Sequence, residues 1–331
     1  MKRALVVLVA LGLLTALQFE LPHVLNPYLF QIVVLCGINI ILAVSLNLIN
    51  GFTGQFSIGH AGFMALGAYG SAMFSLHVGG GWVAAMSAAG IAAPIAQGAA
   101  LVVALVLGGL LAAAAGYLVG LPSLRLRGDY LAIVTLGFGE IIRVLILNVD
   151  AVGAARGLPG IPPWANLFWV GVGVLSVIAV SRNLAHSTHG RALFAIRDDE
   201  VAAEALGVNT TAYKVMAFVL GSFFAGVAGG LFAHFLSYLN PNSFTFIRSI
   251  EVIAMVVLGG LGSVSGSVLA AIVLTVLPEA LRPVRDYRMV IYALMLIGLM
   301  ITRPQGLLGS REISLSWLLG RFRRREPRPT P

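Results

Sequence analysis

Long, uninterrupted runs of apolar residues dominate this chain, and the polar residues between them are few and clustered. Residues 21–124 contain no Asp, Glu, Lys or Arg. A membrane-spanning helix needs about 20 apolar residues, so this stretch alone has room for roughly three or four spans. Ten hydrophobic segments can be drawn along the sequence: 4–19, 28–50, 57–78, 90–121, 129–149, 166–182, 213–239, 249–261, 264–281 and 289–302.

The pattern predicts an all-α polytopic membrane protein of about 8–10 transmembrane helices. A membrane β-barrel is disfavoured, because its strands alternate polar and apolar residues. Composition agrees, since only 10% of the residues are charged, against about 25% in soluble domains. We expect residues 1–310 to form a transmembrane domain and residues 311–331 to form a basic cytoplasmic tail.

Glycine and polar residues interrupt two of the apolar segments. Residues 51–62 read Gly-Phe-Thr-Gly-Gln-Phe-Ser-Ile-Gly-His-Ala-Gly, and residues 259–267 read Gly-Gly-Leu-Gly-Ser-Val-Ser-Gly-Ser. Irregular backbone is tolerated at membrane depth only where protein or a water-filled cavity surrounds it. One break in each half of the chain suggests an internal repeat with a transport pathway at the midplane. Two unrelated helix contacts through small residues would leave the same pattern.

The positive charges predict the orientation of the chain. The net charge is +8, and residues 321–325 read Arg-Phe-Arg-Arg-Arg. Basic residues are retained on the cytoplasmic side of membranes. This retention explains the positive net charge better than nucleic-acid binding does. Contact between the basic residues and anionic lipid is compatible with the same explanation. Ten crossings place both termini in the cytoplasm but leave the basic cluster 282–288 outside. The N-terminal segment resembles a signal peptide without a convincing cleavage site, so we expect an uncleaved first span.

The longest charged connection, 183–214, is suited to forming two short helices on the cytoplasmic face, because it is rich in Ala. Its polar and glycine residues suit helix ends: Asp198 or Asp199 and Asn209 or Thr210 as N-caps, and Gly207 as a left-handed exit residue. A bare connection could be far shorter, so we interpret the loop as a docking surface. The alternative is an amphipathic helix resting on the bilayer.

Two pairs of opposite charges lie in or beside spans at a spacing of three residues. Glu140 and Arg143 lie near the middle of segment 129–149, whereas Arg248 and Glu251 lie near an outer end. Ionisable residues at membrane depth are costly and usually face the bundle interior. Glu140 therefore either lines the pathway or forms a structural ion pair that locks two helices. The second pair is expected to lie on the surface.

The remaining polar residues favour transport over catalysis. His60 lies in the first break, where a lone histidine is more often a hydrogen-bonded structural residue than a ligand. Cys36 is the only cysteine, so neither an internal disulfide nor a cysteine metal site can form. The chain has no ATP-binding Gly-x-x-x-x-Gly-Lys-Ser/Thr motif and no catalytic or metal-binding constellation. The candidates for the translocation pathway are Gln55, Ser57, His60, Thr135, Glu140, Arg143 and Ser265.

Four stretches of the sequence carry motifs in a fixed order. They are residues 45–63, residues 128–143, residues 191–214 with Glu204-Ala205-Leu206-Gly207, and residues 303–309. Together they resemble the LivM type of branched-chain amino acid permeases, over roughly residues 28–310. The third resembles the coupling motif of ATP-binding-cassette (ABC) importer permeases. The loop 152–162 lacks the Thr-Gly-Gly that the family pattern leads us to expect.

The resemblance implies a permease subunit of the bacterial plasma (inner) membrane that moves Leu, Ile and Val inward by alternating access. It implies four partners: a second permease of the LivH type, two cytoplasmic ATPase subunits that bind the ATP, and a periplasmic or lipid-anchored substrate-binding protein. The chain itself would be no enzyme and would need no cofactor. The residues implied in coupling to the ATPases are Arg191, Arg197, Asp198, Asp199, Glu200, Glu204 and Gly207.

Two alternatives stay open at this point. The same machine could carry urea or short amides, whose permeases look similar. A secondary transporter driven by an ion gradient would suit the broken helices and Glu140, but it would not need a structured loop at 183–214.

Overall fold

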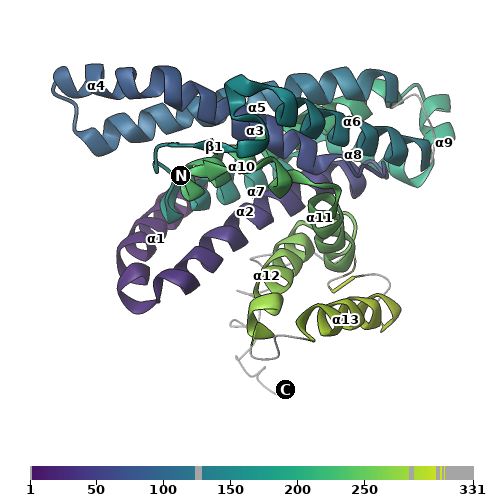
Figure 1. Ribbon diagram of the computed structural model, residues 1–331. Helices are drawn as coiled ribbons and strands as arrows, with labels where there is room; N and C mark the ends of the chain where they lie inside the picture. The colour runs from purple at the N-terminus through teal and green to yellow at the C-terminus, as the bar shows by residue number, and fades with distance from the viewer. Residues whose placement is uncertain (1, 124–128, 283–286, 303–305, 308, 310–331) are drawn as a thin grey trace, which may run out of the picture.

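The computed structural model is almost entirely helical (Figure 1). It describes residues 2–123, 129–282, 287–302, 306, 307 and 309. The expected basic tail, residues 311–331, lies outside the described residues, as do Arg303–Gln305 and Leu308 of the fourth motif.

Helices of very different lengths make up the molecule. The long ones are α1 (Lys2–Val24), α2 (Pro27–Asn50), α5 (Ala93–Ser123), α6 (Asp129–Asn148), α7 (Leu167–Ala185) and α10 (Thr210–Leu236). The shorter ones are α3 (His60–Phe74), α4 (Gly80–Ala88), α8 (Thr188–Asp198), α9 (Glu200–Ala205), α11 (Phe246–Gly259), α12 (Val264–Ala280) and α13 (Arg288–Thr302). The connections contain a π-helical turn (Ser75–Gly79), 3₁₀ turns (Asp150–Val152, Ala154–Arg156, Pro241–Phe244) and the strands β1 (Leu158–Pro159) and β2 (Tyr238–Leu239).

Each of the ten predicted hydrophobic segments contains a helix. Among the described residues, five helices are long and apolar enough to cross a membrane, namely α2, α5, α6 without its first residue, α7 and α10. The prediction of an all-α polytopic membrane protein is therefore confirmed. One predicted boundary is wrong: the segment that was expected to end at residue 78 continues to Ala88, because a π-helical turn carries the chain from α3 into α4 without a break.

Helix α10 lies at the centre of the bundle and packs against α2, α3 and α5. Glycines set the distance between these helices. A Cβ built on Gly67 of α3 would lie 2.1 Å from Gly226 Cα of α10, and one on Gly108 of α5 would lie 2.5 Å from the Gly67 carbonyl oxygen. Small residues allow membrane helices to approach this closely, which explains why the apolar segments are so rich in glycine.

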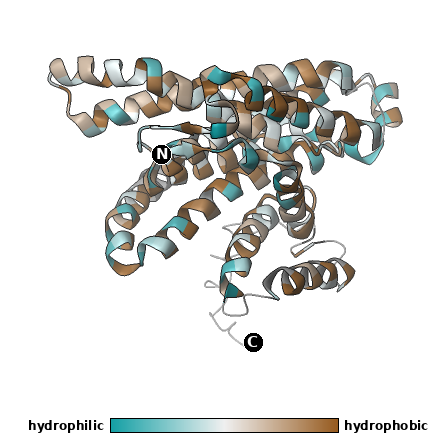
Figure 2. Ribbon diagram, in the orientation of Figure 1, coloured by the Kyte–Doolittle hydropathy of each residue, from teal (hydrophilic) through white to brown (hydrophobic). Residues whose placement is uncertain are grey.

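Hydrophobic residues occur along all the long helices, as Figure 2 shows. Large hydrophobic side chains project outward from the long helices, among them Leu110, Leu118, Ile133 and Leu145. Soluble monomers rarely expose such continuous apolar surface. A lipid environment accounts for it, because lipid tails solvate these side chains without cost.

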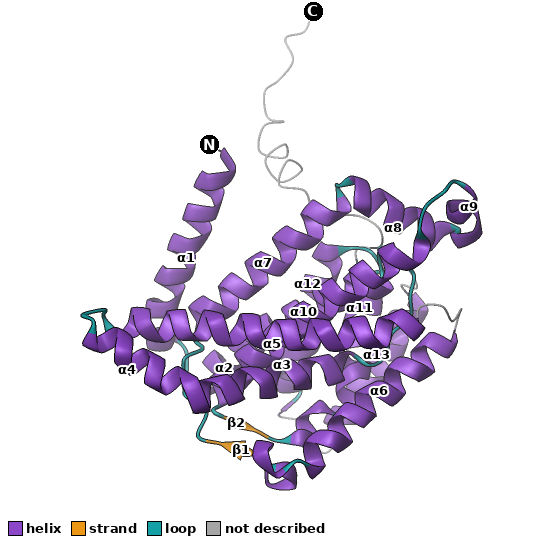
Figure 3. Cartoon of the chain, turned by 90° about the horizontal axis from the view of Figure 1, so that it is seen from above, coloured by secondary structure: helices purple, strands orange, loops and turns teal. Residues whose placement is uncertain are grey.

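Two structures mark opposite ends of the molecule (Figures 1 and 3). At one end α4 and the start of α5 form a helical hairpin, and at the other end lie α8 and α9. The strands β1 and β2 pair antiparallel, with Leu158 opposite Leu239. This pairing joins the connection between α6 and α7 to the segment that follows α10.

Candidate functional site

The two predicted breaks are in direct contact with each other. The first is residues 51–59, between α2 and α3, and the second is residues 260–263, between α11 and α12. Asn47 of α2 joins them: its Oδ1 accepts a hydrogen bond from the Gly262 N–H at 2.9 Å, and its Nδ2 donates to the Ser263 carbonyl at 3.1 Å. A buried side chain thus satisfies backbone groups that lipid could not.

Glycine is required at this contact for two different reasons. A Cβ on Gly51 would lie 1.9 Å from Asn47 Oδ1 and 2.3 Å from the Gly262 nitrogen, so no side chain fits. Gly260 and Gly262 instead have φ angles of +104° and +87°, which residues with a Cβ rarely adopt. The glycines therefore bring two distant stretches of backbone together.

The family motif at the C-terminal end of the chain also packs here. The Leu307 N–H donates to the Leu258 carbonyl at 2.7 Å, at the end of α11. Gly306 has a φ angle of +84°, and a Cβ on it would lie 2.5 Å from Gly260 Cα. Residues that follow α13 therefore close over the second break.

Several pathway candidates hold the backbone of the first break in place. Thr135 Oγ1 of α6 accepts from the Ile58 N–H at 3.0 Å, and Asn50 Oδ1 accepts from the Ser57 N–H at 3.2 Å. Ser57 and Thr135 are both buried, and Gln55 is half-buried. In the described part of the chain, Gln55 Oε1, Ser57 Oγ and His60 Nδ1 are buried at or beside the first break without a hydrogen-bond partner, and Tyr69, Ser181 and Ser222 carry such atoms elsewhere. Unpartnered buried polar atoms are unusual in proteins.

His60 is fully buried at the start of α3. Its Nε2 lies 2.9 Å from Ser45 Oγ, and Ser45 Oγ donates to the Leu42 carbonyl at 2.9 Å. The hydroxyl hydrogen is thereby used, so Nε2 is the donor to the serine oxygen. These contacts fit the structural role that we expected of a lone histidine.

Glu140 and Arg143 form an ion pair at 2.8 Å within α6. The pair joins residues of one helix, as their spacing predicted, and the choice between a pathway role and a structural role stays a prediction. Glu140 faces a crevice of about 10 Å³ that Gly59, Gly62 and Ser249 also line. A space of this size holds about one water molecule, and no substrate could pass there in this conformation. Ser265 lies apart from this pair, half-buried in the first turn of α12.

The second charged pair lies partly at the surface, since the Glu251 side chain is 43% exposed. Arg248 and Glu251 of α11 interact at 2.8 Å, and the Arg248 side chain is only 19% exposed. Arg248 also donates to Asn39 Oδ1, near the middle of α2. An asparagine within the apolar segment 28–50 was the sequence signal for this contact.

The predicted loop forms two short helices, as expected. Of the two candidate N-caps, Asp199 caps α9 by accepting from the Val201 and Ala202 N–H groups at 2.9 and 3.0 Å. Gly207 has a φ angle of +83° and ends the turn after α9. Asn209 rather than Thr210 caps α10, since its Oδ1 accepts from the Ala212 N–H at 3.1 Å.

Two acidic residues fix α9 against the start of α10. Lys214 Nζ lies 2.6 Å from Glu200 Oε2, and the lysine side chain is only 2% exposed. Thr210 Oγ1 donates to Glu204 Oε1 at 2.8 Å. The loop is therefore a rigid attachment to α10 rather than a loose connection.

The outer surface of the loop is open to a partner. Arg191, Asp198, Asp199, Glu204 and Gly207 are exposed, and Glu200 is half-buried. Leu206 is 84% exposed and Val201 63% exposed. Large apolar side chains displayed among charges are typical of protein interaction sites. We did not single out Val201 or Leu206 from the sequence, although Leu206 lies within the quoted motif.

Arg197 connects this loop to the first break. Its guanidinium lies 5.1 Å from the centroid of the Phe194 ring, and its Nη1 donates to the Gly51 carbonyl at 3.4 Å. Phe194 in turn packs on Phe52, with ring centroids 5.1 Å apart. Gly54, with a φ angle of +69°, leaves room for the arginine stem, which a Cβ there would approach to 3.1 Å. Movement of α8 would therefore reach residues 51–59 directly.

Comparison with known proteins shows extended similarity. The family model described as "branched-chain amino acid transport system / permease component" matches residues 28–301. The Escherichia coli K12 protein "high-affinity branched-chain amino acid transport system permease protein LivM" is 37% identical over 89% of this chain and 73% of its own length. LivM of Salmonella typhimurium is 38% identical over 82% of this chain and 68% of its own length.

A more distant similarity covers part of the chain. The Salmonella typhimurium "high-affinity branched-chain amino acid transport system permease protein LivH" is 32% identical over 44% of this chain and 48% of its own length. No solved structure matches. The family model covers most of the sequence, including both breaks and the loop that contacts them, and so this chain belongs to the family of branched-chain amino acid transport system permease components.

Proposed function

We propose that this chain is the permease subunit of an ATP-driven importer that moves Leu, Ile and Val into the cytoplasm by alternating access. Its relatives are named as branched-chain amino acid permeases, and the cargo is carried over from those names. The partners are a second permease of the LivH type, two cytoplasmic ATPase subunits and a substrate-binding protein. ATP binds to the ATPase subunits, and this chain is not an enzyme.

The contact between Arg197 and Gly51 carries the proposal. The ATPases dock on α8 and α9, where Val201 and Leu206 project outward. Because Arg197 touches the first break, and Asn47 ties the first break to the second, a shift of α8 displaces both. A partner shifts a conformational equilibrium only if it binds the two conformations with different affinity. Closed ATPases bind one conformation of the permease more tightly than the other and so shift the equilibrium toward it.

The orientation follows from the docking role. If α8 and α9 face the cytoplasm, α4 at the opposite end of the molecule faces the outside. The positive charges near both ends of the sequence favour termini in the cytoplasm, and the chain lies in the plasma (inner) membrane of the cell. Residues 1–310 make up the permease domain, and residues 311–331 a basic tail that adds positive charge on the inner side.

The pathway runs past the first break. The support is the row of polar residues there: Gln55 and Ser57 carry unpartnered buried atoms, and Glu140 faces a crevice beside Gly59 and Gly62. We expect Glu140→Gln to reduce uptake while the permease pair still assembles. Failure of the variant to assemble would show that Glu140 is structural instead.

Uptake measurements test the function as a whole. Cells that lack this chain are given labelled leucine or labelled urea, before and after the chain is restored. We expect leucine uptake to return, and to stop when ATP is depleted while the ion gradient is held. Return of urea uptake alone would reassign the cargo. Uptake that survives ATP depletion and collapses with the ion gradient would identify a secondary transporter.

A further inference from the structure

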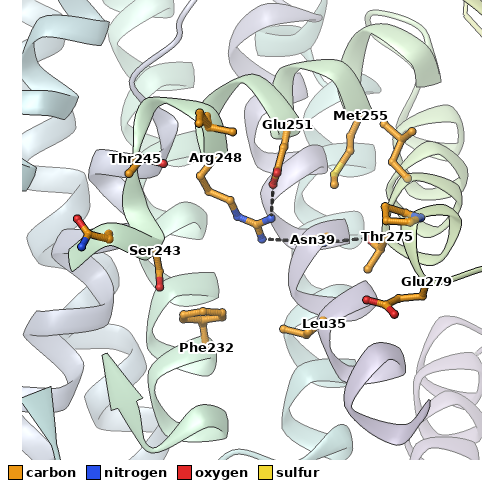
Figure 4. Close-up of a pocket in the computed structure, with 14 residues that line it drawn as sticks. Leu35, Asn39, Phe232, Ser243, Thr245, Arg248, Glu251, Met255, Thr275 and Glu279 are labelled. Carbon is orange, nitrogen blue, oxygen red and sulfur yellow. Dashed lines mark hydrogen bonds and ion pairs between the residues drawn. The ribbon is translucent and has the colours of Figure 1, made fainter. Parts of the chain in front are cut away.

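A cavity of about 520 Å³ lies between α2, α10, α11 and α12, apart from the breaks and the coupling loop (Figure 4). Sites for small molecules typically measure about 300–1,000 Å³. Charged, amide and hydroxyl side chains share its wall with apolar ones. The polar members are Asn39, Asn242, Ser243, Thr245, Arg248, Glu251, Thr275 and Glu279.

Arg248 occupies the centre of the polar wall. Figure 4 shows its guanidinium between Glu251 and Asn39. One terminal nitrogen is bonded to Glu251 Oε2 at 2.8 Å and the other to Asn39 Oδ1. A guanidinium carries five N–H donors, and these two contacts use only part of them. Donors therefore remain for a carboxylate that enters the cavity, and two parallel bonds from Arg to carboxylate are a strong, directional interaction.

The position of Arg248 is itself held in place. Asn39 Nδ2 donates to Thr275 Oγ1 at 2.8 Å, and Thr275 Oγ1 donates to the Ala271 carbonyl at 2.6 Å. This chain of hydrogen bonds runs from α11 through α2 to α12. Arg248 is thus preorganised by two neighbouring helices.

Carboxylates lie around the same cavity. Glu251 is paired with Arg248 and is 43% exposed at its side chain. Glu279 comes from α12, and the Tyr28 hydroxyl donates to its Oε2. The charged groups in the wall are therefore one guanidinium and two carboxylates. A bound molecule could pair a negative group with the guanidinium and a positive group with a carboxylate. Such a wall suits a dipolar ligand better than a simple anion.

Apolar side chains complete the wall. The apolar surface comes from Leu35 of α2, Phe232 of α10, Met255 of α11 and Leu274 of α12. An aliphatic side chain could be buried against them while its charged end stayed near Arg248. Ligand sites commonly combine an apolar lining with a few placed polar groups in this way.

The cavity borders the middle of α2 and the helix that leads to the second break. Asn39 is halfway along α2, whose 24 residues span Pro27–Asn50. Asn47, which joins the two breaks, lies eight residues further on the same helix, about two turns away. Substrate sites of transporters are typically found near the midplane beside interrupted helices. Because α11 ends at the second break, the helix that carries part of the cavity wall leads directly into that break.

We propose that this cavity binds a zwitterionic α-amino acid with an aliphatic side chain during its passage through the permease. Its carboxylate contacts Arg248, its ammonium group contacts Glu279 and Glu251, and its side chain lies on Leu35, Phe232 and Met255. The inference rests on the proposed function, and it adds a binding site within the permease itself.

Protection from a thiol reagent tests the site directly. Ser243 lines the cavity and is exposed, so Ser243→Cys provides a label position in a Cys36→Ala background. The importer assembled with its partner subunits is treated with a maleimide in the absence of nucleotide. We expect millimolar leucine to slow the labelling of this chain, and leucinamide, which lacks the carboxylate, to slow it far less. Equal labelling rates with and without leucine, in an importer that takes up leucine, would overturn the site.

Substitution of the arginine tests the assigned contact. In the labelling background, Arg248→Gln should raise the leucine concentration needed for half-maximal protection about tenfold to a hundredfold. It should also abolish the difference between leucine and leucinamide. Arg156→Gln, in the connection between α6 and α7, is the matched control and should change neither. Unchanged protection in Arg248→Gln would overturn the assignment.

The two proposals fail in different ways. The labelling arm keeps Arg248 intact, so it does not depend on whether the Arg248→Gln variant folds. An importer that never takes up leucine contradicts the proposed function. An importer that takes up leucine by ATP hydrolysis but shows no protection at Ser243→Cys contradicts the cavity site alone.

Discussion

Asn47 and Gly262 join two breaks that are 215 positions apart in the sequence. The Gly262 N–H donates to Asn47 Oδ1 at 2.9 Å, and the same side chain donates onward to the Ser263 carbonyl at 3.1 Å. Each break lies between two helices, and Asn47, which bonds to the second break, is itself fully buried. One asparagine therefore stabilises both irregular segments and couples their positions.

Loss of this asparagine should destabilise the permease. Asn47→Ala leaves the half-buried Gly262 N–H without its partner, at a cost of about 1–3 kcal/mol, whereas the Ser263 carbonyl keeps the bonds that it accepts from Ser267. We expect a lower midpoint of thermal unfolding for the purified complex. Asn148→Ala is the control, because Asn148 is exposed at the end of α6 and bonds only locally, to the Val144 carbonyl. Equal midpoints for both variants would show that the contact between the breaks contributes nothing to stability.

Two glycines should respond in opposite ways to an added methyl group. In Gly51→Ala the new Cβ would lie 1.9 Å from Asn47 Oδ1 and 2.3 Å from the Gly262 nitrogen, so the breaks must separate. Gly137 of α6 has nothing within 4 Å of its Cβ position, and Ala favours a helix over Gly by about 1 kcal/mol. We expect Gly51→Ala to lose folded, assembled permease on gel filtration, and Gly137→Ala to retain it. Normal recovery of Gly51→Ala would contradict the close approach.

The ion pair between Lys214 and Glu200 should show unequal effects of its two halves. Glu200→Gln leaves the charge of Lys214 buried at 2% exposure, and stranding a buried charge typically costs about 3–5 kcal/mol. Lys214→Met strands only the half-buried glutamate and should cost less. The double variant should recover much of the loss, because no lone charge remains. Limited proteolysis of the loop measures the effect, and equal protease sensitivity in the two single variants would refute the explanation.

Arg197 should matter for coupling more than for docking. Arg197→Ala removes the contact with the Gly51 carbonyl and the packing on Phe194, whereas Val201 and Leu206 stay exposed for the ATPases. We expect the ATPases to co-purify and hydrolyse ATP, while leucine uptake falls about tenfold or more. Arg182→Ala, an exposed position in the last turn of α7, should behave like wild type. Full uptake in Arg197→Ala would show that another contact carries the motion.

Local chemistry determined much of this protein from the sequence alone. Apolar length and continuity predicted the ten helical segments, because a span must satisfy its own backbone hydrogen bonds in lipid. Short-range capping rules narrowed each helix start in the loop to two neighbouring residues, Asp198 or Asp199 and Asn209 or Thr210, and placed the exit at Gly207, because those bonds join residues only a few positions apart. The structure selects Asp199 and Asn209. The motifs in fixed order identified the family, which the comparisons confirm.

Only the tertiary structure decided which distant residues meet. The sequence showed two breaks but could not show that Asn47 bonds to Gly262, because such a contact depends on how α2, α11 and α12 pack. Arg248 and Glu251 were expected on the surface, and Glu251 is 43% exposed there, but the sequence could not show that Arg248 bonds to Asn39 of α2. The spacing of Glu140 and Arg143 already placed them on one helix face, whereas the crevice beside Gly59 and Gly62 that Glu140 faces arises only from the packing of the helices. Spacing along a chain fixes which residues share a helix face, whereas burial and long-range pairing arise only when the helices pack together.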